Sequence, residues 1–166
     1  MPPCLDTYVV SERTRAVIER FLDRYVDREL SEDRGSEQLL VAPVESLEGS
    51  EPARWAWEPE GTLTAVIERG LADPSSAFVV YLRPKDRGHH QAILAFTTDD
   101  AVVCGVSLDD PDDAPEVFKT AQALLEDLAT QLSAVRGFIG VEQPPPLTGT
   151  TTDHEVWLLE WHRGAA

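Results

Sequence analysis

Three apolar segments lie close together in the middle of the chain, and they limit the possible fold more than any other feature. They cover residues 78–82 (FVVYL), 92–97 (AILAFT) and 101–108 (AVVCGVSL). Each has the length and the β-branched or aromatic content of a strand. The connections between them are short, and short connections join antiparallel neighbours, whereas parallel strands need a long crossover. The three segments therefore predict an antiparallel meander.

The expected turn between the last two segments sets the register of the meander. Asp99 and Asp100 favour a tight turn. If that turn has two residues, Phe96 lies opposite Val103 and Ile93 lies opposite Val106. One face then holds Leu94, Phe96 and Val103, and the other holds Ile93, Val102, Cys104, Val106 and Leu108. Both faces are apolar, so we expect the sheet to be covered on both sides; the alternative is that one side meets a partner.

Helical patterns precede and follow the meander. Residues 11–30 predict a long helix with Ser11 as N-cap, an apolar stripe, and a solvated charged face that includes Arg13. Residues 62–71 predict a shorter helix. A second long helix is expected to begin at Asp113, which would cap it together with Glu116, and to end at Gly137. Its expected stripe contains Val117, Phe118, Ala121, Leu124, Leu125, Leu128 and Leu132.

Shorter apolar runs at 39–42, 138–141 and 155–161 predict further strands. The order of the elements indicates one α+β domain covering residues 1–166. In it, two long helices and one short helix pack on a mostly antiparallel sheet whose centre is the three-stranded meander.

The chain carries a large acidic excess, with 30 Asp and Glu against 14 Lys and Arg and a net charge of −16. The excess is concentrated in residues 35–82 and 91–135. Such a surface repels phosphate backbones and anionic lipids, so direct binding to nucleic acid or membranes is not expected. It favours solubility or a basic protein partner.

Two observations point to the cytoplasm as the location. The chain shows no signal peptide and no apolar stretch long enough to span a membrane. Its two cysteines, Cys4 and Cys104, are far apart in the sequence, which suits a reducing compartment. A disulfide between them is the alternative.

Two acidic surfaces are the expected contacts for a partner. The first is the run that contains Asp109, Asp110, Asp112 and Asp113. The second combines carboxylates with tryptophans, which are enriched at binding hot spots; it contains Glu45, Glu48, Glu51, Trp55, Trp57 and Glu58. A further pair, Trp157 and Trp161, is expected on one side of the last strand.

The sequence carries no recognisable catalytic or metal motif. The acidic run lacks the glycine of an EF-hand loop, so we interpret it as the entry to a helix rather than a cation site. His89 and His90 follow each other in a basic segment (83–90), which is interpreted as a solvated hairpin loop. No catalytic residue, metal or cofactor is therefore predicted, and enzymatic activity is left open but not favoured.

Two functional hypotheses remain. The size, acidity and expected fold resemble bacterial immunity proteins as a class, which implies a cytoplasmic binding protein that neutralises a basic toxin, for example a nuclease. No motif specifies one immunity family. The alternative is a small-ligand-binding protein or enzyme with a pocket between sheet and helices. Arg83, His89, His90 and His154 would be its first candidate residues, and the oligomeric state is open in both cases.

Overall fold

The computed structural model describes residues 3–32, 39–43, 58–146 and 157–164. These residues form eight strands and four helices. In chain order they are β1 (Cys4–Glu12), α1 (Arg15–Tyr25), α2 (Arg28–Glu32), β2 (Leu39–Pro43), β3 (Glu58–Gly61), α3 (Leu63–Ala72), β4 (Phe78–Leu82), β5 (Gln91–Phe96), β6 (Ala101–Asp109), α4 (Pro115–Gln131), β7 (Arg136–Val141) and β8 (Trp157–His162).

All eight strands belong to one sheet with the order β3-β2-β4-β5-β6-β1-β7-β8. Every neighbouring pair is antiparallel. The expected meander, β4-β5-β6, lies near the middle of this sheet. The α+β fold class with a mostly antiparallel sheet is thereby confirmed.

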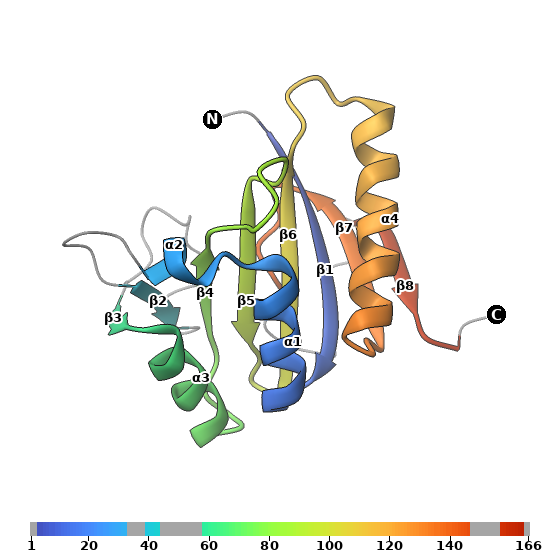
Figure 1. Ribbon diagram of the computed structural model, residues 1–166. Helices are drawn as coiled ribbons and strands as arrows, with labels where there is room; N and C mark the ends of the chain where they lie inside the picture. Colours follow the sequence, from blue (N-terminus) through green and yellow to red (C-terminus); the bar gives the residue numbers. More distant parts are fainter. Residues whose placement is uncertain (1–2, 33–38, 44–57, 147–156, 165–166) are drawn as a thin grey trace.

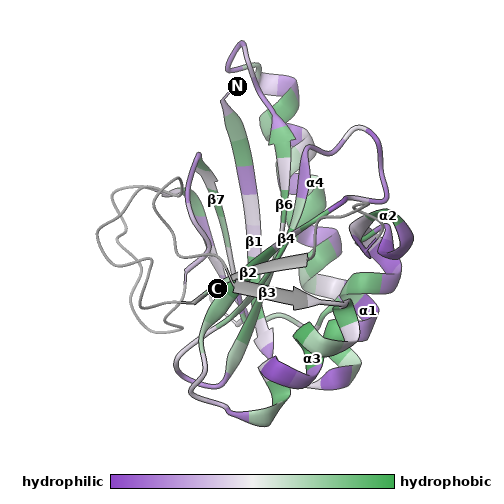
Figure 2. Cartoon of the chain, turned by 90° about the vertical axis from the view of Figure 1, so that its left-hand side faces the viewer, coloured by the Kyte–Doolittle hydropathy of each residue, from purple (hydrophilic) through white to green (hydrophobic). Residues whose placement is uncertain are grey.

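The helices pack on the same face of the sheet, where Figure 1 shows α1, α3 and α4 side by side in front of the strands. The apolar sides of these helices and the strand residues that face them form one core cluster. Figure 2, turned by 90°, shows the helices gathered on one side of the strands. The opposite face of the sheet carries a second buried cluster, which includes Tyr8, Ile93, Val103 and Phe138. Both faces of the central strands are therefore buried, as expected. None of the helices among the described residues has the length and hydrophobicity needed to cross a membrane.

The first strand, β1, is the main element that the sequence patterns did not predict. It pairs with β6 on one side and β7 on the other. Ser11, expected to cap a helix, is the eighth residue of this strand and is buried. The helix begins later, where the hydroxyl of Thr14 accepts a hydrogen bond from the backbone N–H of Val17. The expected helix over 11–30 is therefore wrong at its start, and it is broken at Val26–Asp27 into α1 and α2.

The register between β5 and β6 also differs from the expected one. Phe96 pairs with Val102 and Ile93 with Gly105, one residue from the predicted partners. The hydroxyl of Thr97 bonds to the backbone of Ala101. The N–H of Thr97 also donates to the carbonyl of Ala101, so the turn between these two paired residues contains three residues, 98–100, rather than two. Because side chains alternate along a strand, this slip reverses the face assignment of β6. Val102, Cys104 and their alternate neighbours lie on the helix face with Leu94 and Phe96.

The start of α4 is built differently from the predicted cap. Ala114 is the N-cap residue and offers no side-chain hydrogen bond, and Pro115 follows it. Asp113 has a positive φ of 50° and does not cap the helix. The carboxylate of Asp110 instead accepts a hydrogen bond from the Ala114 N–H at 2.8 Å. The helix ends at Gln131, and Gly137 belongs to β7.

Neither cysteine takes part in a disulfide. Cys4 pairs with Asp109 at the start of β1, whereas Cys104 pairs with Val9 further along the same ladder. Side chains alternate between the two faces along a strand. Cys104 lies opposite Val9, which is five residues after Cys4, so the two thiols point to opposite faces of the sheet. The alternative of a Cys4–Cys104 bridge is thus excluded by this structure.

Candidate functional site

The acidic run before α4 divides into buried and exposed groups. Asp110 is 7% exposed and bonded to the start of α4, so it holds the loop in shape. Asp109 ends β6, and its half-exposed carboxylate lies 3.0 Å from Nδ1 of His90. Asp112 and Asp113 are exposed, and so is Glu116 in the first turn of α4. The part of the run available to a partner is therefore smaller than the sequence implied.

The second predicted surface is largely beyond the described residues. Glu45, Glu48, Glu51, Trp55 and Trp57 lie outside the described ranges. Glu58 is the first residue of β3, where its backbone pairs with Val41. His154, one of the candidates for a ligand site, also falls outside the described residues.

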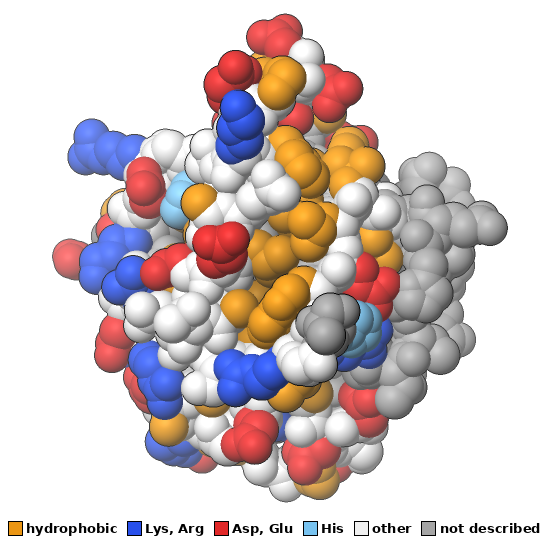
Figure 3. All heavy atoms as spheres, turned by 90° about the vertical axis from the view of Figure 1, so that its right-hand side faces the viewer, with side chains coloured by type: hydrophobic (Ala, Val, Ile, Leu, Met, Phe, Trp, Pro, Cys, Tyr) orange, Lys and Arg blue, Asp and Glu red, His pale blue; other side chains and the backbone are white. Residues whose placement is uncertain are grey.

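A groove lies between α4 and β8, the last strand of the sheet among the described residues. It has a volume of about 370 Å³. Its lining residues are Gln122, Leu125, Glu126, Ala129, Thr130, Leu159 and Trp161. Figure 3 shows a band of apolar side chains on this side, below a tip crowded with acidic side chains. That tip is where the loop after β6 leads into α4, so one helix carries both the acidic end and one wall of the groove.

A β-bulge decides which tryptophan lines the groove. Leu159 pairs with Ile139 and Trp157 with Gly140, so Leu158 is an extra residue. Bulges of this kind change the direction of the side chains that precede them. Trp161 consequently packs with the helix-side core, whereas Trp157 packs on the opposite face, with its ring centroid 4.9 Å from that of Phe138. The expectation that the pair lies on one side is wrong.

On the face away from the helices, a buried carboxylate forms the centre of a polar cluster. Asp6 is 6% exposed, accepts a hydrogen bond from the hydroxyl of Ser107, and accepts another from the N–H of Gln143 at 2.9 Å. The Tyr8 hydroxyl donates to the carbonyl of the same Gln143 at 2.6 Å. Burial raises the pKa of Asp6 to about 6, although both hydrogen bonds favour the charged form. Sequence patterns missed this group because β1 itself was not predicted.

Cys4, His90 and Asp109 lie next to this cluster. One ligand atom from each lies within 4.8 Å of the other two. The Sγ of Cys4 is 3.8 Å from Oδ1 of Asp109, the same oxygen that approaches His90. Burial and the carboxylates of Asp6, Asp109 and Glu142 raise the pKa of the Cys4 thiol to about 11. No local sequence motif could reveal that these thiol, imidazole and carboxylate groups lie together, because the three residues are far apart in the chain.

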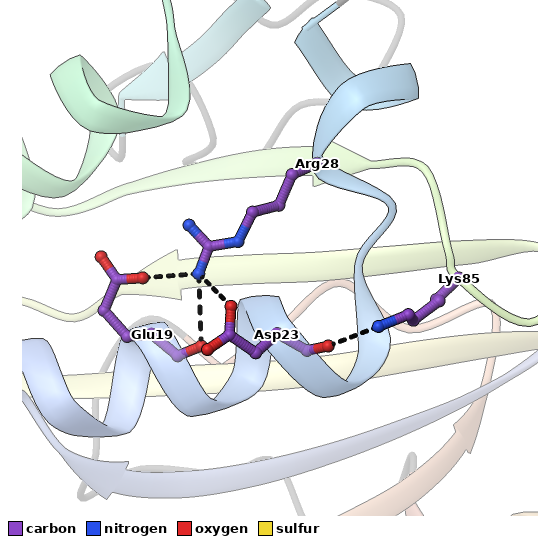
Figure 4. A network of polar contacts seen from close by, with 4 residues as sticks. All are labelled: Glu19, Asp23, Arg28 and Lys85. Atoms are coloured by element: carbon purple, nitrogen blue, oxygen red, sulfur yellow. Dashed lines mark hydrogen bonds and ion pairs between the residues drawn. The ribbon is translucent and has the colours of Figure 1, made fainter.

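The basic segment 83–90 is folded back onto α1 rather than fully solvated. Lys85 donates from Nζ to the carbonyl of Asp23 at 2.8 Å, and the N–H of Lys85 bonds to the carbonyl of Tyr25. Beside it, Arg28 contacts Glu19 at 2.5 Å and Asp23 at 2.6 Å, as Figure 4 shows. Part of the positive charge of this region is thus used within the molecule.

Comparison with known proteins places few constraints on this chain. No protein-family model matches the sequence, and no curated protein matches it. Among solved structures the chain is similar to the Pseudomonas aeruginosa T6SS protein PA0821, with 18% sequence identity and a TM-score of 0.41. The similarity covers 91% of this chain and 45% of that one, so this chain spans less than half the length of the solved structure. A similarity at this level does not assign a function.

Proposed function

We propose that this protein binds a basic protein partner along the side formed by α4 and β8. The observation that carries the proposal is the partly apolar groove beside Trp161 in a molecule with a net charge of −16. A partner with apolar side chains for the groove and basic side chains for the start of α4 fits both features.

The distribution of ion pairs supports a basic partner. Arg24 makes a two-pronged contact with Asp127, at 2.8 and 3.0 Å, and Arg28 bridges two carboxylates of α1. No ion pair to Asp112, Asp113 or Glu116 comes from any described residue. An uncompensated acidic patch raises the association rate of a cationic partner and repels anionic ones.

The groove supports a protein rather than a simple counter-ion. Trp161 is partly exposed there, and tryptophan is among the residue types that contribute most to binding energy. The neighbouring β8 is an edge strand in the sheet that the described residues form. Edge strands offer backbone donors and acceptors to an incoming strand.

Within this proposal, the partner is a basic toxin and the protein is its immunity-like inhibitor. Nucleases need cationic surfaces because they bind phosphates. An acidic inhibitor covers such a surface by complementing its charge.

The proposal is tested with a partner captured from the source cell on the tagged protein and then purified. Its association rate should fall steeply between about 0.05 and 0.5 M salt, as the Debye length shrinks to a few Å. Asp112→Lys should slow association at low salt more than the exposed Glu29→Lys on α2, which makes the same change of charge and is the matched control. Trp161→Ala should speed dissociation at least about tenfold, as expected for a hot-spot residue. Leu158→Ala, at the exposed extra residue of the bulge, should have little effect. Equal effects of the groove and control variants would refute the proposed surface.

A small-ligand function is the second candidate, because the groove volume falls within the usual range for ligand pockets of about 300–1,000 Å³. Gln122 and Thr130 would supply the polar contacts. A ligand seated there would change the fluorescence of Trp161, and Trp161→Phe would abolish that change. A protein partner that binds equally well when the groove is filled by a small molecule would favour the ligand function.

A further inference from the structure

The sheet brings three metal-ligating side chains to one place from three separate segments. Cys4 begins β1 and Asp109 ends β6, and the two residues are direct partners across the strands. His90 precedes β5, and its backbone N–H donates to the carbonyl of Ser107 at 2.8 Å, which fixes it beside β6. Backbone pairing, rather than a flexible loop, thus sets the positions of these three residues.

The distances fit a first coordination shell. Zinc bonds to nitrogen, oxygen and sulfur are about 2.0–2.3 Å long, so tetrahedral ligand atoms lie roughly 3.3–3.6 Å apart. His90 Nδ1 and Asp109 Oδ1 are 3.0 Å apart, and Cys4 Sγ lies 3.8 Å from the same oxygen. The remaining pair is within 4.8 Å. The two specified distances therefore differ from the tetrahedral values by only about 0.3 Å each.

The surroundings also favour a cation with affinity for sulfur and nitrogen. Asp6 and Glu142 add negative charge near Cys4, and this charge contributes to the raised pKa of the thiol. A bound divalent ion reverses that effect, because a coordinating thiol loses its proton outright. Calcium and magnesium prefer oxygen ligands, whereas a set of Cys, His and Asp suits zinc and similar transition metals.

Access to the site is open from solvent. The side chain of His90 is 32% exposed and that of Asp109 is 50% exposed. An ion can therefore enter without rearrangement of the core, and a water molecule can occupy the fourth position.

We propose that Cys4, His90 and Asp109 bind one zinc ion or a similar divalent transition metal ion. The ion would connect the start of β1 to the end of β6 and to the segment before β5. The inference is independent of the partner surface, because neither the groove nor Asp112 and Asp113 belong to the ligand set.

The test uses cobalt as a spectroscopic probe on the full chain freed of metal with a chelator. One equivalent of Co²⁺ should produce the sulfur-to-cobalt charge-transfer band of a thiolate ligand and the intense visible bands of a four-coordinate ion. Zn²⁺ should displace it. Cys4→Ser should abolish the charge-transfer band, while His90→Ala and Asp109→Asn should each weaken cobalt binding at least about tenfold, as the loss of a ligand or its support does.

Two matched variants separate this site from adventitious binding. His89→Ala removes the adjacent imidazole, and Cys104→Ala removes the other thiol; both should keep the band and the affinity. Zn²⁺ should also raise the unfolding midpoint of the wild type but not of Cys4→Ser, since a ligand stabilises the state to which it binds. Absence of the charge-transfer band in the wild type, or its persistence in Cys4→Ser, would overturn the proposal.

Discussion

The side chain of Arg13 donates a hydrogen bond from Nε to the backbone carbonyl of Gly70, 2.6 Å away, and so joins the end of β1 to α3. Its other nitrogens donate to the carbonyls of Pro74, Thr97, Asp73 and Ser76 at 2.7–3.1 Å. The guanidinium also lies 5.0 Å from the ring centroid of Phe96, and the residue is only 9% exposed. One buried cation therefore satisfies five carbonyls, from the last turn of α3, the loop that follows it and the turn after β5, and the sequence pattern had placed it in solvent.

Replacing Arg13 should destabilise the fold strongly. Arg13→Ala leaves five carbonyls without their donor, and we expect the free energy of unfolding to fall by about 3–5 kcal/mol, because the two buried acceptors, on Gly70 and Thr97, each cost about 1–3 kcal/mol when left unsatisfied. The stability of Arg13→Lys should lie between those of the wild type and Arg13→Ala, because an ammonium has fewer donors than a guanidinium and a different geometry. Urea unfolding measures both. Arg15→Ala is the control, since its exposed pair with Glu68 should be worth less than about 1 kcal/mol; equal losses would contradict the role of Arg13.

Gly70→Ala should reverse the usual effect of this substitution in a helix. Alanine normally stabilises a helix interior by about 1 kcal/mol relative to glycine. Here an added Cβ would overlap the ring of Phe96, which is itself fully buried and stacked on Phe78. We expect a net loss of about 1–3 kcal/mol in thermal or urea unfolding, the usual range for overpacking. A gain in stability would show that the Phe96 ring can move aside.

Asp6 should make stability depend on pH. Its pKa is raised from 3.8 to about 6, so the folded state holds this proton more tightly than the unfolded chain. The stabilisation is complete below about pH 4 and is lost as the pH rises through about 6. Between pH 4.5 and 7.5, the wild type should therefore lose about 2 kcal/mol relative to Asp6→Asn, which cannot titrate. Urea unfolding of both proteins with a chelator present measures the difference, and a constant difference across this range would disprove it.

The two thiols should differ in reactivity. Cys104 is fully buried on the helix face, and burial raises the pKa of its thiol far above the ordinary value. Cys4 is only partly buried, with a pKa of about 11, so a small fraction of it is thiolate at pH 8. A thiol reagent should modify Cys4 slowly in the native protein and Cys104 only on unfolding. Two groups reacting at the same rate in the native protein would contradict this assignment.

Local patterns in the sequence were sufficient to predict several helices and strands. The strand at 78–82 has the bounds that its apolar run predicted, and α3 begins after Thr62, close to the expected helix start. The buried positions Ala121, Leu124, Leu125 and Leu128 of α4 also follow the expected stripe. In these segments the periodicity and the flanking residues agree with the tertiary contacts, so local information is enough.

Other features depended on pairing between distant segments. The alternation in 4–12 is weak, and this segment is a strand because β6 and β7 lie on both sides of it. The slip of one residue between β5 and β6 came from the length of a turn, and the bulge at Leu158 separated Trp157 from Trp161. Register and bulges are properties of two strands together, so neither strand specifies them alone.

The sequence by itself determined the α+β class, the meander and the acidic surface, because composition and periodicity act within each segment. Only the tertiary structure decided which charged groups are exposed to a partner and which are bonded within the protein. It buried Arg13 and Asp110, folded Lys85 onto α1, and brought Cys4, His90 and Asp109 together. The reason is that residues far away in the chain form the environment of a charged or ligating group. Only the tertiary structure brings those distant residues next to it.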